Sequence, residues 1–259
     1  MVTKERMRMN VDSFIAVDLE TTGLQPQKDF IIEIGALKYV DGECVETFST
    51  LVKPPISISR KIYDITGIDD EMVADAPAIS DAFMDFLKFV GNETTLLGHN
   101  LRFDYSFLKA SAEKMGLPFQ KYGLDTLTLA RKFLPQLPKK NLETVSRFYD
   151  VINLRAHRAF EDAETTAKVY FKILEEFGTE NPEHFVPKEM QVKIKKSEPM
   201  TARQKNYLLD LLKYHKIQVE AFFDEKGVSI ETLTKSQASK IIDGIILQYG
   251  RISRRYSLR

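Results

Sequence analysis

Two acidic residues interrupt an apolar strand pattern near the start of the chain, and this feature most constrains the fold. In the segment FIAVDLETTGL, Asp18 and Glu20 stand two positions apart among residues typical of a buried strand. Because side chains alternate between strand faces, both carboxylates point to one face. Like charges held this close need a cation or a shared proton, which a metal ion would supply. An isolated pair is more often the acidic face of an edge strand, but the following Thr-Thr-Gly disfavours that interpretation.

Two later segments add acidic residues at the start of expected helices. In LLGHNLRFDYSFL, a buried strand runs through a Gly-His-Asn turn into a helix with Asp104 in its first turn. In AHRAFEDAETT, His157 precedes Asp162, which opens another helix. Each has a structural alternative, because the helix dipole alone favours an acid at an N-terminus and a histidine beside charged residues is usually solvated. If each of these acids had only a structural role, three separate segments would resemble parts of an acidic site by coincidence. A shared site is therefore favoured.

Hydrophobic periodicity predicts an α/β fold, a mixed sheet flanked by helices. Three strand patterns between Phe14 and Leu51 are joined by short turns and predict an antiparallel meander, and residues 94–98 add another strand. The later pattern has the period of helices. The expected helices cover residues 81–90, 104–115, 141–149 and 161–177.

The composition changes after Phe177. Residues 11–178 are expected to form the catalytic domain, and the proline-containing residues 179–200 a linker or irregular strap. Two T-x-x-Q capping boxes, at Thr201 and Thr234, then predict two amphipathic helices in a small helical domain, 201–250, followed by a basic tail, 251–259. This appendage either stabilises or dimerises the protein, or binds nucleic acid or a partner through its tail and the KIKK segment, 193–196.

Overall charge and cysteine content narrow the class of protein less than the motifs do. The 37 Lys and Arg residues balance 37 Asp and Glu residues, so any nucleic-acid contact must use local patches or metals. The single cysteine, Cys44, cannot form an internal disulfide, and the polar first residues lack the apolar core of a secretory signal. We therefore expect a cytoplasmic protein.

The segments VDLETTG, GHNLRFDYSFL and HRAFEDA, in this order, resemble the three exonuclease motifs of the DEDDh nucleases. This family of 3′-to-5′ exonucleases contains the proofreading epsilon subunit of bacterial replicative polymerases. The resemblance covers roughly Val11 to Phe177 and implies a ribonuclease H-like fold. It also implies four metal ligands, Asp18, Glu20, Asp104 and Asp162, and a general base, His157.

The chemistry of phosphodiester cleavage explains why these residue types are needed. Two divalent cations about 4 Å apart can stabilise the attacking and leaving oxygens together. Carboxylate ligands suit Mg²⁺ or Mn²⁺. Histidine, whose ordinary pKa is about 6.5, can accept a proton from the attacking water at neutral pH.

The resemblance also implies substrate contacts. Thr21 would meet the 3′ hydroxyl of the terminal nucleotide, and Leu24 would wedge beside its base. Phe103 either stacks on a base or belongs to the core, and His99 and Asn100 either contact phosphate or cap their turn. Asp125 is expected to be a helix N-cap.

These observations predict a 3′-to-5′ exonuclease that acts on single-stranded DNA in proofreading or repair and releases nucleoside monophosphates. An RNA 3′-trimming enzyme on the same fold is the nearest alternative, and a catalytically silent nucleic-acid-binding module is another. The intact set of acids and His157 argues against the silent module. We recognise no clamp-binding or polymerase-binding motif, so association with a DNA polymerase stays an open question.

Overall fold

The computed structural model describes residues 12–153, 155–192, 198–225 and 228–253 of the 259-residue chain. Its centre is a six-stranded sheet with the strand order β3-β2-β1-β4-β5-β6. The strands are β1 (Phe14–Thr21), β2 (Ile31–Val40), β3 (Glu43–Leu51), β4 (Thr95–Gly98), β5 (Tyr122–Asp125) and β6 (Lys188–Glu189).

Strand directions place three strand ends at one edge of the sheet. The meander β1-β2-β3 is antiparallel, as the sequence predicts, whereas β1, β4 and β5 run parallel to one another. The carboxyl ends of these parallel strands therefore meet at the same edge. The short β6 pairs antiparallel with β5 and completes a mixed sheet.

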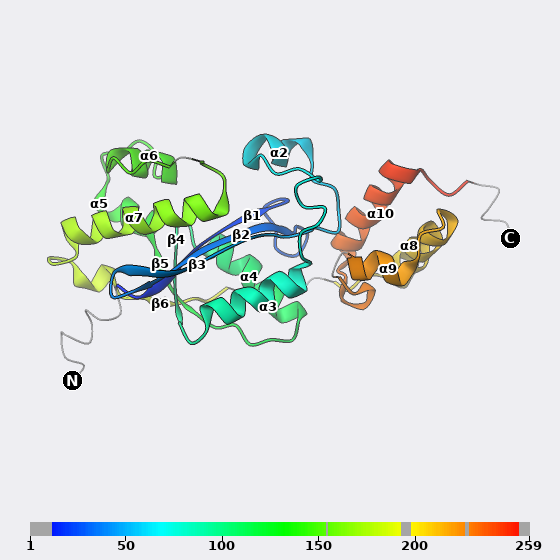
Figure 1. Ribbon diagram of the computed structural model, residues 1–259, viewed down its shortest axis with the longest axis horizontal. Coiled ribbons are helices and arrows are strands. Elements are labelled where there is room, and N and C mark those ends of the chain that lie inside the picture. Colours follow the sequence, from blue (N-terminus) through cyan, green and yellow to red (C-terminus); the bar gives the residue numbers. More distant parts are fainter. Residues whose placement is uncertain (1–11, 154, 193–197, 226–227, 254–259) are drawn as a thin grey trace.

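Helices cover both faces of this sheet (Figure 1). One face packs against α5, α6 and α7, and the opposite face packs against α3 and α4. The catalytic-domain helices are α2 (Arg60–Thr66), α3 (Ile79–Val90), α4 (Arg102–Lys114), α5 (Thr126–Phe133), α6 (Leu142–Phe148) and α7 (Ala159–Phe177). This arrangement confirms the predicted fold class of a mixed sheet flanked by helices.

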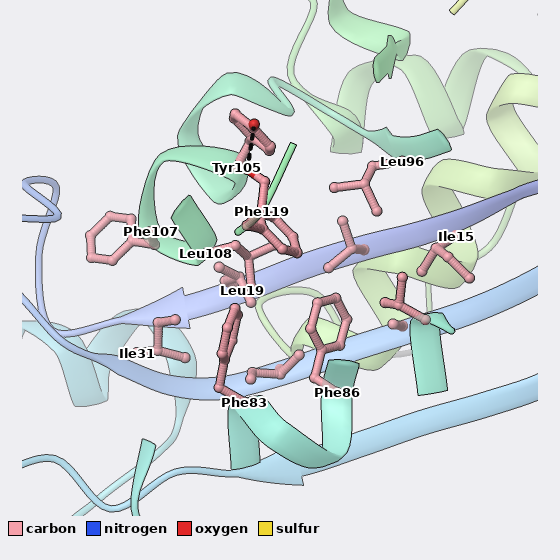
Figure 2. Packing of buried hydrophobic residues seen from close by; sticks show 14 of the residues in the cluster. Ile15, Leu19, Ile31, Phe83, Phe86, Leu96, Tyr105, Phe107, Leu108 and Phe119 are labelled. Carbon is pink, nitrogen blue, oxygen red and sulfur yellow. Dashed lines mark hydrogen bonds between the residues drawn. The ribbon is translucent and has the colours of Figure 1, made fainter. Parts of the chain in front are cut away.

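Alternation along β1 divides the core between the two faces. Ile15, Val17 and Leu19 belong to the same core cluster as Phe83 and Phe86 of α3. Figure 2 shows Ile15 and Leu19 in this cluster. Phe14 and Ala16 point to the other face, toward α7. The side chains that continue this second row, at positions 18 and 20, are carboxylates rather than apolar groups.

Local signals located most helices correctly. Each of the four helices predicted before residue 178 forms: α3, α4 and α7 begin two residues before the expected start, and α6 begins one residue after it. Asp125 is the N-cap of α5, as predicted, and accepts a hydrogen bond from the Leu127 N–H at 3.0 Å. The sequence analysis did not predict α2, β5 or β6.

The C-terminal helical unit contains α8 (Ala202–Tyr214), α9 (Val219–Glu225) and α10 (Lys235–Tyr249). Both predicted capping boxes are present, one at Thr201 and one at Thr234. The apolar faces of α8 and α10 pack together, as expected, whereas α9 and the short 3₁₀ helix at Ile230–Thr232 were not predicted. Within the described part of the chain, no helix is both long and apolar enough to cross a membrane.

Part of the segment expected to be a linker or strap packs on the catalytic domain. A 3₁₀ helix, Pro182–His184, is followed by Phe185, which is buried in the core beneath α7, and then by β6. The KIKK segment and the tail beyond residue 253 lie outside the described residues.

A glycine on β2 lets α7 approach the sheet closely. Gly35 pairs with Asp18, and a methyl group added to its α-carbon would lie 2.2 Å from the backbone of Ala159 and Phe160. No side chain fits in that space without moving the helix. The absence of a side chain at this position therefore brings the first turn of α7 directly over the acidic end of β1.

We expect Gly35→Ala to destabilise the fold by about 1–3 kcal/mol, because overpacking must displace the backbone at the start of α7. Chemical denaturation measures the loss. Gly244→Ala on α10 is the control, since outside its own helix no described atom lies within 4 Å of the added carbon. That variant should be as stable as the parent protein or more stable by up to about 1 kcal/mol. Equal stability of both variants would contradict the close-packing argument.

Candidate active site

Two carboxylates stand side by side at the carboxyl end of β1. Asp18 and Glu20 lie on the face that α7 covers, and both are half-buried. Their partners across β2 are Gly35 and Glu33, so the acids share this face with a glycine and a third carboxylate. The pairing shifts register between Glu20 and Thr21, where the strand leaves the sheet.

The third predicted ligand lies on α4, the helix that follows the turn after β4. Asp104 lies in the first turn of α4, is only 3% exposed, and accepts a hydrogen bond from the Leu19 N–H at 3.1 Å. This bond joins residues that are 85 positions apart and fixes the carboxylate beside β1. Because Leu19 lies between the two β1 acids, Asp104 is held next to both.

The fourth acid and the histidine come from the start of α7. Asp162 accepts hydrogen bonds from the Asn153 side-chain amide at 2.5 Å and from the His157 N–H at 3.1 Å. His157 itself is exposed, with a backbone φ of 65° in the left-handed region that non-glycine residues rarely adopt. The hydrogen bond to Asp162 stabilises this unusual backbone and leaves the imidazole at the open side of the cluster.

Glu33, the β2 carboxylate paired with Glu20, has a structural role that the sequence analysis missed. Glu33 is 1% exposed, accepts a hydrogen bond from the Ala159 N–H at 2.9 Å, and forms a bidentate ion pair with Arg158 whose shortest distance is 2.6 Å. It therefore caps the N-terminus of α7, where negative charge is favourable. In the sequence, Glu33 stands out as a single acid within the apolar segment FIIEIG.

Burial raises the pKa values of all four predicted ligands, and repulsion from neighbouring acids adds to the rise. Burial is the main cause for each, and it raises the pKa values of Asp18 and Asp104 well above the ordinary range. For Glu20, burial and repulsion from Asp162 and Glu33 raise the pKa to about 8, against a weaker opposing effect of Arg158. Burial also raises the pKa of Asp162, although its two hydrogen-bond donors oppose the rise. The folded chain thus concentrates negative charge that only protons or cations can neutralise.

The donor set fits divalent metal ions. Glu20, His157 and Asp162 each offer a ligand atom, and these atoms lie within 4.8 Å of one another. Asp18 and Asp104 complete a set dominated by carboxylate oxygens, which hard divalent cations prefer. Burying these acids close to one another raises their pKa values, and a bound cation would oppose that rise.

The residues predicted to contact the terminal nucleotide lie at the same edge. Thr21 is 7% exposed, and its hydroxyl donates to the Gly23 carbonyl at 2.6 Å. Leu24, by contrast, is 80% exposed at the tip of the following loop, so its side chain is available to a ligand. Their roles toward the substrate stay predictions.

The structure also locates the other three predicted contacts, two in the β4–α4 turn (His99 and Asn100) and one in the first turn of α4 (Phe103). Both ring nitrogens of His99 have partners within the protein, the Thr126 hydroxyl at 2.9 Å and the Lys140 carbonyl at 2.7 Å, and burial lowers its pKa. Asn100 is exposed, with φ of 67°, and its N–H donates to Asp125. Phe103 is half-buried with its ring centroid 5.1 Å from that of Phe107. Their substrate contacts likewise stay predictions.

A groove opens from the histidine side of the cluster. It has a volume of about 620 Å³ and runs between α6 and the loop that precedes α7. His157, Asp162 and Asn153 form its inner wall, and Arg147 lines the part farther along α6. An exposed Ile152 also borders it. Asp162 is the predicted ligand that lines this groove, so Asp162 and His157 are accessible to a ligand larger than water.

Known sequences match the catalytic domain. Residues 15–170 match the RNase_T family model, whose description is "Exonuclease". The chain is 43% identical over 175 residues to DNA polymerase III PolC-type of Caldanaerobacter subterraneus, a match covering 68% of this chain and 12% of that protein. It is 36% identical to DNA polymerase III subunit epsilon of Aquifex aeolicus, covering 66% of this chain and 86% of that subunit.

Solved structures share the fold over the same region. Exonuclease X, in complex with 5′ overhanging duplex DNA, matches with a TM-score of 0.52 and 28% identity, covering 64% of this chain and 93% of that one. Exonuclease I of E. coli, in complex with an oligonucleotide, matches with a TM-score of 0.57 and 20% identity, covering 67% and 42%. The second likeness supports the fold alone.

We expect the metal-free protein to lose stability as the pH rises. A carboxyl group whose pKa is raised by folding stabilises the folded state fully below its unfolded pKa, about 4.3 for glutamate, and this contribution disappears as the pH passes the folded pKa. For Glu20 that upper limit is about 8. Urea unfolding in chelator between these limits measures the decline.

Asp18→Asn is the comparison for this pH series, because it removes one of the repelling charges. Its stability in chelator should fall less steeply with pH, as should that of the parent protein in saturating Mg²⁺. A parent protein and variant with parallel profiles in chelator would contradict the assignment of repulsion to this cluster.

Proposed function

Because this chain belongs to the RNase T family of exonucleases, we propose that it removes nucleotides one at a time from the 3′ end of single-stranded DNA. The observation that carries the proposal is the cluster itself. Three separate chain segments bring four carboxylates and one exposed histidine to a single sheet edge, beside an open groove. A binding module without chemistry has no need to concentrate so much repelling charge.

The proposed metal ligands are Asp18, Glu20, Asp104 and Asp162. Two Mg²⁺ or Mn²⁺ ions bound there would supply charge stabilisation to the attacking and leaving oxygens of the scissile phosphate. The surrounding hydrogen bonds keep these acids in place before substrate arrives. In particular, the Leu19 N–H holds Asp104, and Asn153 holds Asp162.

His157 is the proposed general base. Its exposed ring stands at the open side of the acids, where a water molecule can reach both the imidazole and a phosphate in the groove. The imidazole takes a proton as the water oxygen bonds to phosphorus, and the bond from phosphorus to the 3′ oxygen of the preceding nucleotide breaks. The products are a nucleoside 5′-monophosphate and a strand with a new 3′ hydroxyl.

Thr21 and Leu24 are the proposed contacts to the terminal nucleotide, with His99, Asn100 and Phe103 around the adjoining turn. The exposed leucine would pack on a base face, a contact that tolerates any base. Thr21 directly follows Glu20, so its buried hydroxyl lies next to the proposed metal ligands. These positions fit recognition of a strand end rather than of an internal sequence.

DNA is favoured over RNA because relatives with substantial identity are named as DNA polymerase III chains or were solved with duplex DNA. Proofreading or repair in the cytoplasm is the proposed setting, which makes a DNA polymerase the partner to test. The PolC-type relatives are much longer, since this chain spans 12% of their length, so the activities of those whole proteins do not transfer with the match.

Digestion of matched single strands tests the proposal. With Mg²⁺ or Mn²⁺, a DNA strand labelled at its 5′ end should shorten stepwise, whereas an RNA strand of the same sequence should shorten much more slowly. Asp18→Ala should produce no shortening while remaining folded, because it removes a repelled charge. Faster digestion of RNA would favour the RNA-trimming alternative, and activity in the Asp18 variant would contradict the ligand assignment.

We expect His157→Ala to lower the cleavage rate by about 10²–10⁴-fold, the usual contribution of a general base. The acids do not depend on the imidazole for their positions, because His157 contacts Asp162 through its backbone N–H. Mn²⁺ binding measured by calorimetry should therefore persist in the variant. Unfolding together with lost metal binding would instead assign the histidine a structural role.

A further inference from the structure

The C-terminal helical unit contacts the loop between β1 and β2, residues 22–30. Lys240 on α10 forms an ion pair with Asp29, and the Thr234 hydroxyl at the start of the same helix donates to the Gln27 carbonyl at 3.0 Å. A third contact is apolar, since Ile56 of the catalytic domain packs against the core of the helical unit. Two of these contacts therefore fall on a single loop.

Asp29 determines the shape of this loop. Its carboxylate is on a side chain that is 8% exposed, and its second oxygen accepts a hydrogen bond from the Gln25 N–H at 2.9 Å. The group lies so close to Gly23 that a carbon added there would be 2.5 Å from the Asp29 Cγ. The carboxylate thus fills the inside of the turn, and only glycine at position 23 leaves room for it.

The same loop carries Leu24, one of the proposed substrate contacts, and directly follows Thr21, another. Thr21 donates to the Gly23 carbonyl at 2.6 Å, and the Thr22 N–H donates to the Phe30 carbonyl at 2.8 Å. Between these fixed points, Leu24 projects into solvent with 80% of its surface exposed. The position of the leucine beside the active site follows from the turn that Asp29 holds.

The interface is not closely packed around this ion pair. A cavity of about 210 Å³ separates the two units, with Asp29 and Pro26 on one side and Leu233 and Gln237 on the other. Beside this cavity, Lys240 and Thr234 make direct polar contacts to the loop.

We propose that Lys240 is a positioning residue for the exonuclease reaction. By pairing with Asp29, it holds the loop so that Leu24 meets the terminal nucleotide. This inference rests on the proposed function. Lys240 touches neither metal ligands nor the reacting phosphate, so its effect is on capture of the 3′ end rather than on bond cleavage.

Removing the lysine leaves a buried carboxylate without its cation. Such a group is costly, and the cheapest relief is to rotate Asp29 toward water. That rotation breaks its hydrogen bond to the Gln25 N–H and releases the turn next to Leu24. Lys240→Met removes the charge while keeping a long apolar side chain, and Lys240→Arg keeps the charge.

Lys205→Met is the matched control. Lys205 forms an ion pair with Glu231 inside the helical unit, and its side chain is 36% exposed, the same fraction as that of Lys240. The two variants lose equal charge from equally exposed lysines, but only one lysine contacts the loop. A general effect of charge on DNA binding would appear in both.

Kinetics on single-stranded DNA test the proposal. Lys240→Met should raise KM roughly tenfold, which corresponds to about 1.4 kcal/mol, with a much smaller change in kcat. Lys240→Arg and Lys205→Met should keep the parent KM. In a Leu24→Ala background, Lys240→Met should add little, because both act on the same contact. Equal KM values for Lys240→Met and Lys205→Met, or full additivity with Leu24→Ala, would overturn the proposal.

Hydrogen exchange gives a readout that needs no activity. Amides of the loop, including those of Gln25 and Asp29, should exchange faster in Lys240→Met than in Lys205→Met or the parent protein. Unchanged exchange in the loop would overturn the positioning role even if the enzyme is active. Inactivity of the parent protein on DNA would contradict the proposed function, while faster loop exchange in that case would still establish the contact.

Discussion

Mutual repulsion among the acids at the end of β1 is the constraint around which the catalytic domain is organised. Burial and neighbouring charge raise the pKa of every predicted ligand, so each acid must be held in place by other groups. The Leu19 N–H holds Asp104, and Asn153 and the His157 N–H hold Asp162. Packing and backbone hydrogen bonds thus maintain an arrangement that electrostatics alone would separate.

The packing of α7 shows which neighbouring groups offset the repulsion among the acids. Gly35 removes the side chain that would keep the helix away, and Glu33 caps its first turn while pairing with Arg158. The cap adds another negative charge near Glu20, but the arginine compensates it and lowers the Glu20 pKa. The helix N-terminus can therefore approach the acids, which brings Asp162 into the cluster without further exposure of the core.

The sequence predicted those structural features that are determined by residues close together along the chain. Alternation along β1 placed Asp18 and Glu20 on one face, and the capping boxes at Thr201 and Thr234 located two helices. The two-residue strand β6 was not predicted, because so short a segment has no period, and its pairing with β5 decides its conformation. Glu33 was missed for a related reason, since its partner Arg158 lies 125 residues away.

In the proposed mechanism, the region that matches the family performs the chemistry and the C-terminal unit affects how firmly the strand end is held. The hydrogen bonds that hold Asp104 and Asp162 come from Leu19, Asn153 and His157, within the region that matches the family at 15–170. The C-terminal unit lies beyond that match, yet Lys240 reaches across 211 positions to a loop inside it. An addition placed in this way can change how firmly the strand end is held while leaving the arrangement of the metal ligands untouched. Selection acting on α10 would then adjust capture of the substrate separately from the rate of bond cleavage.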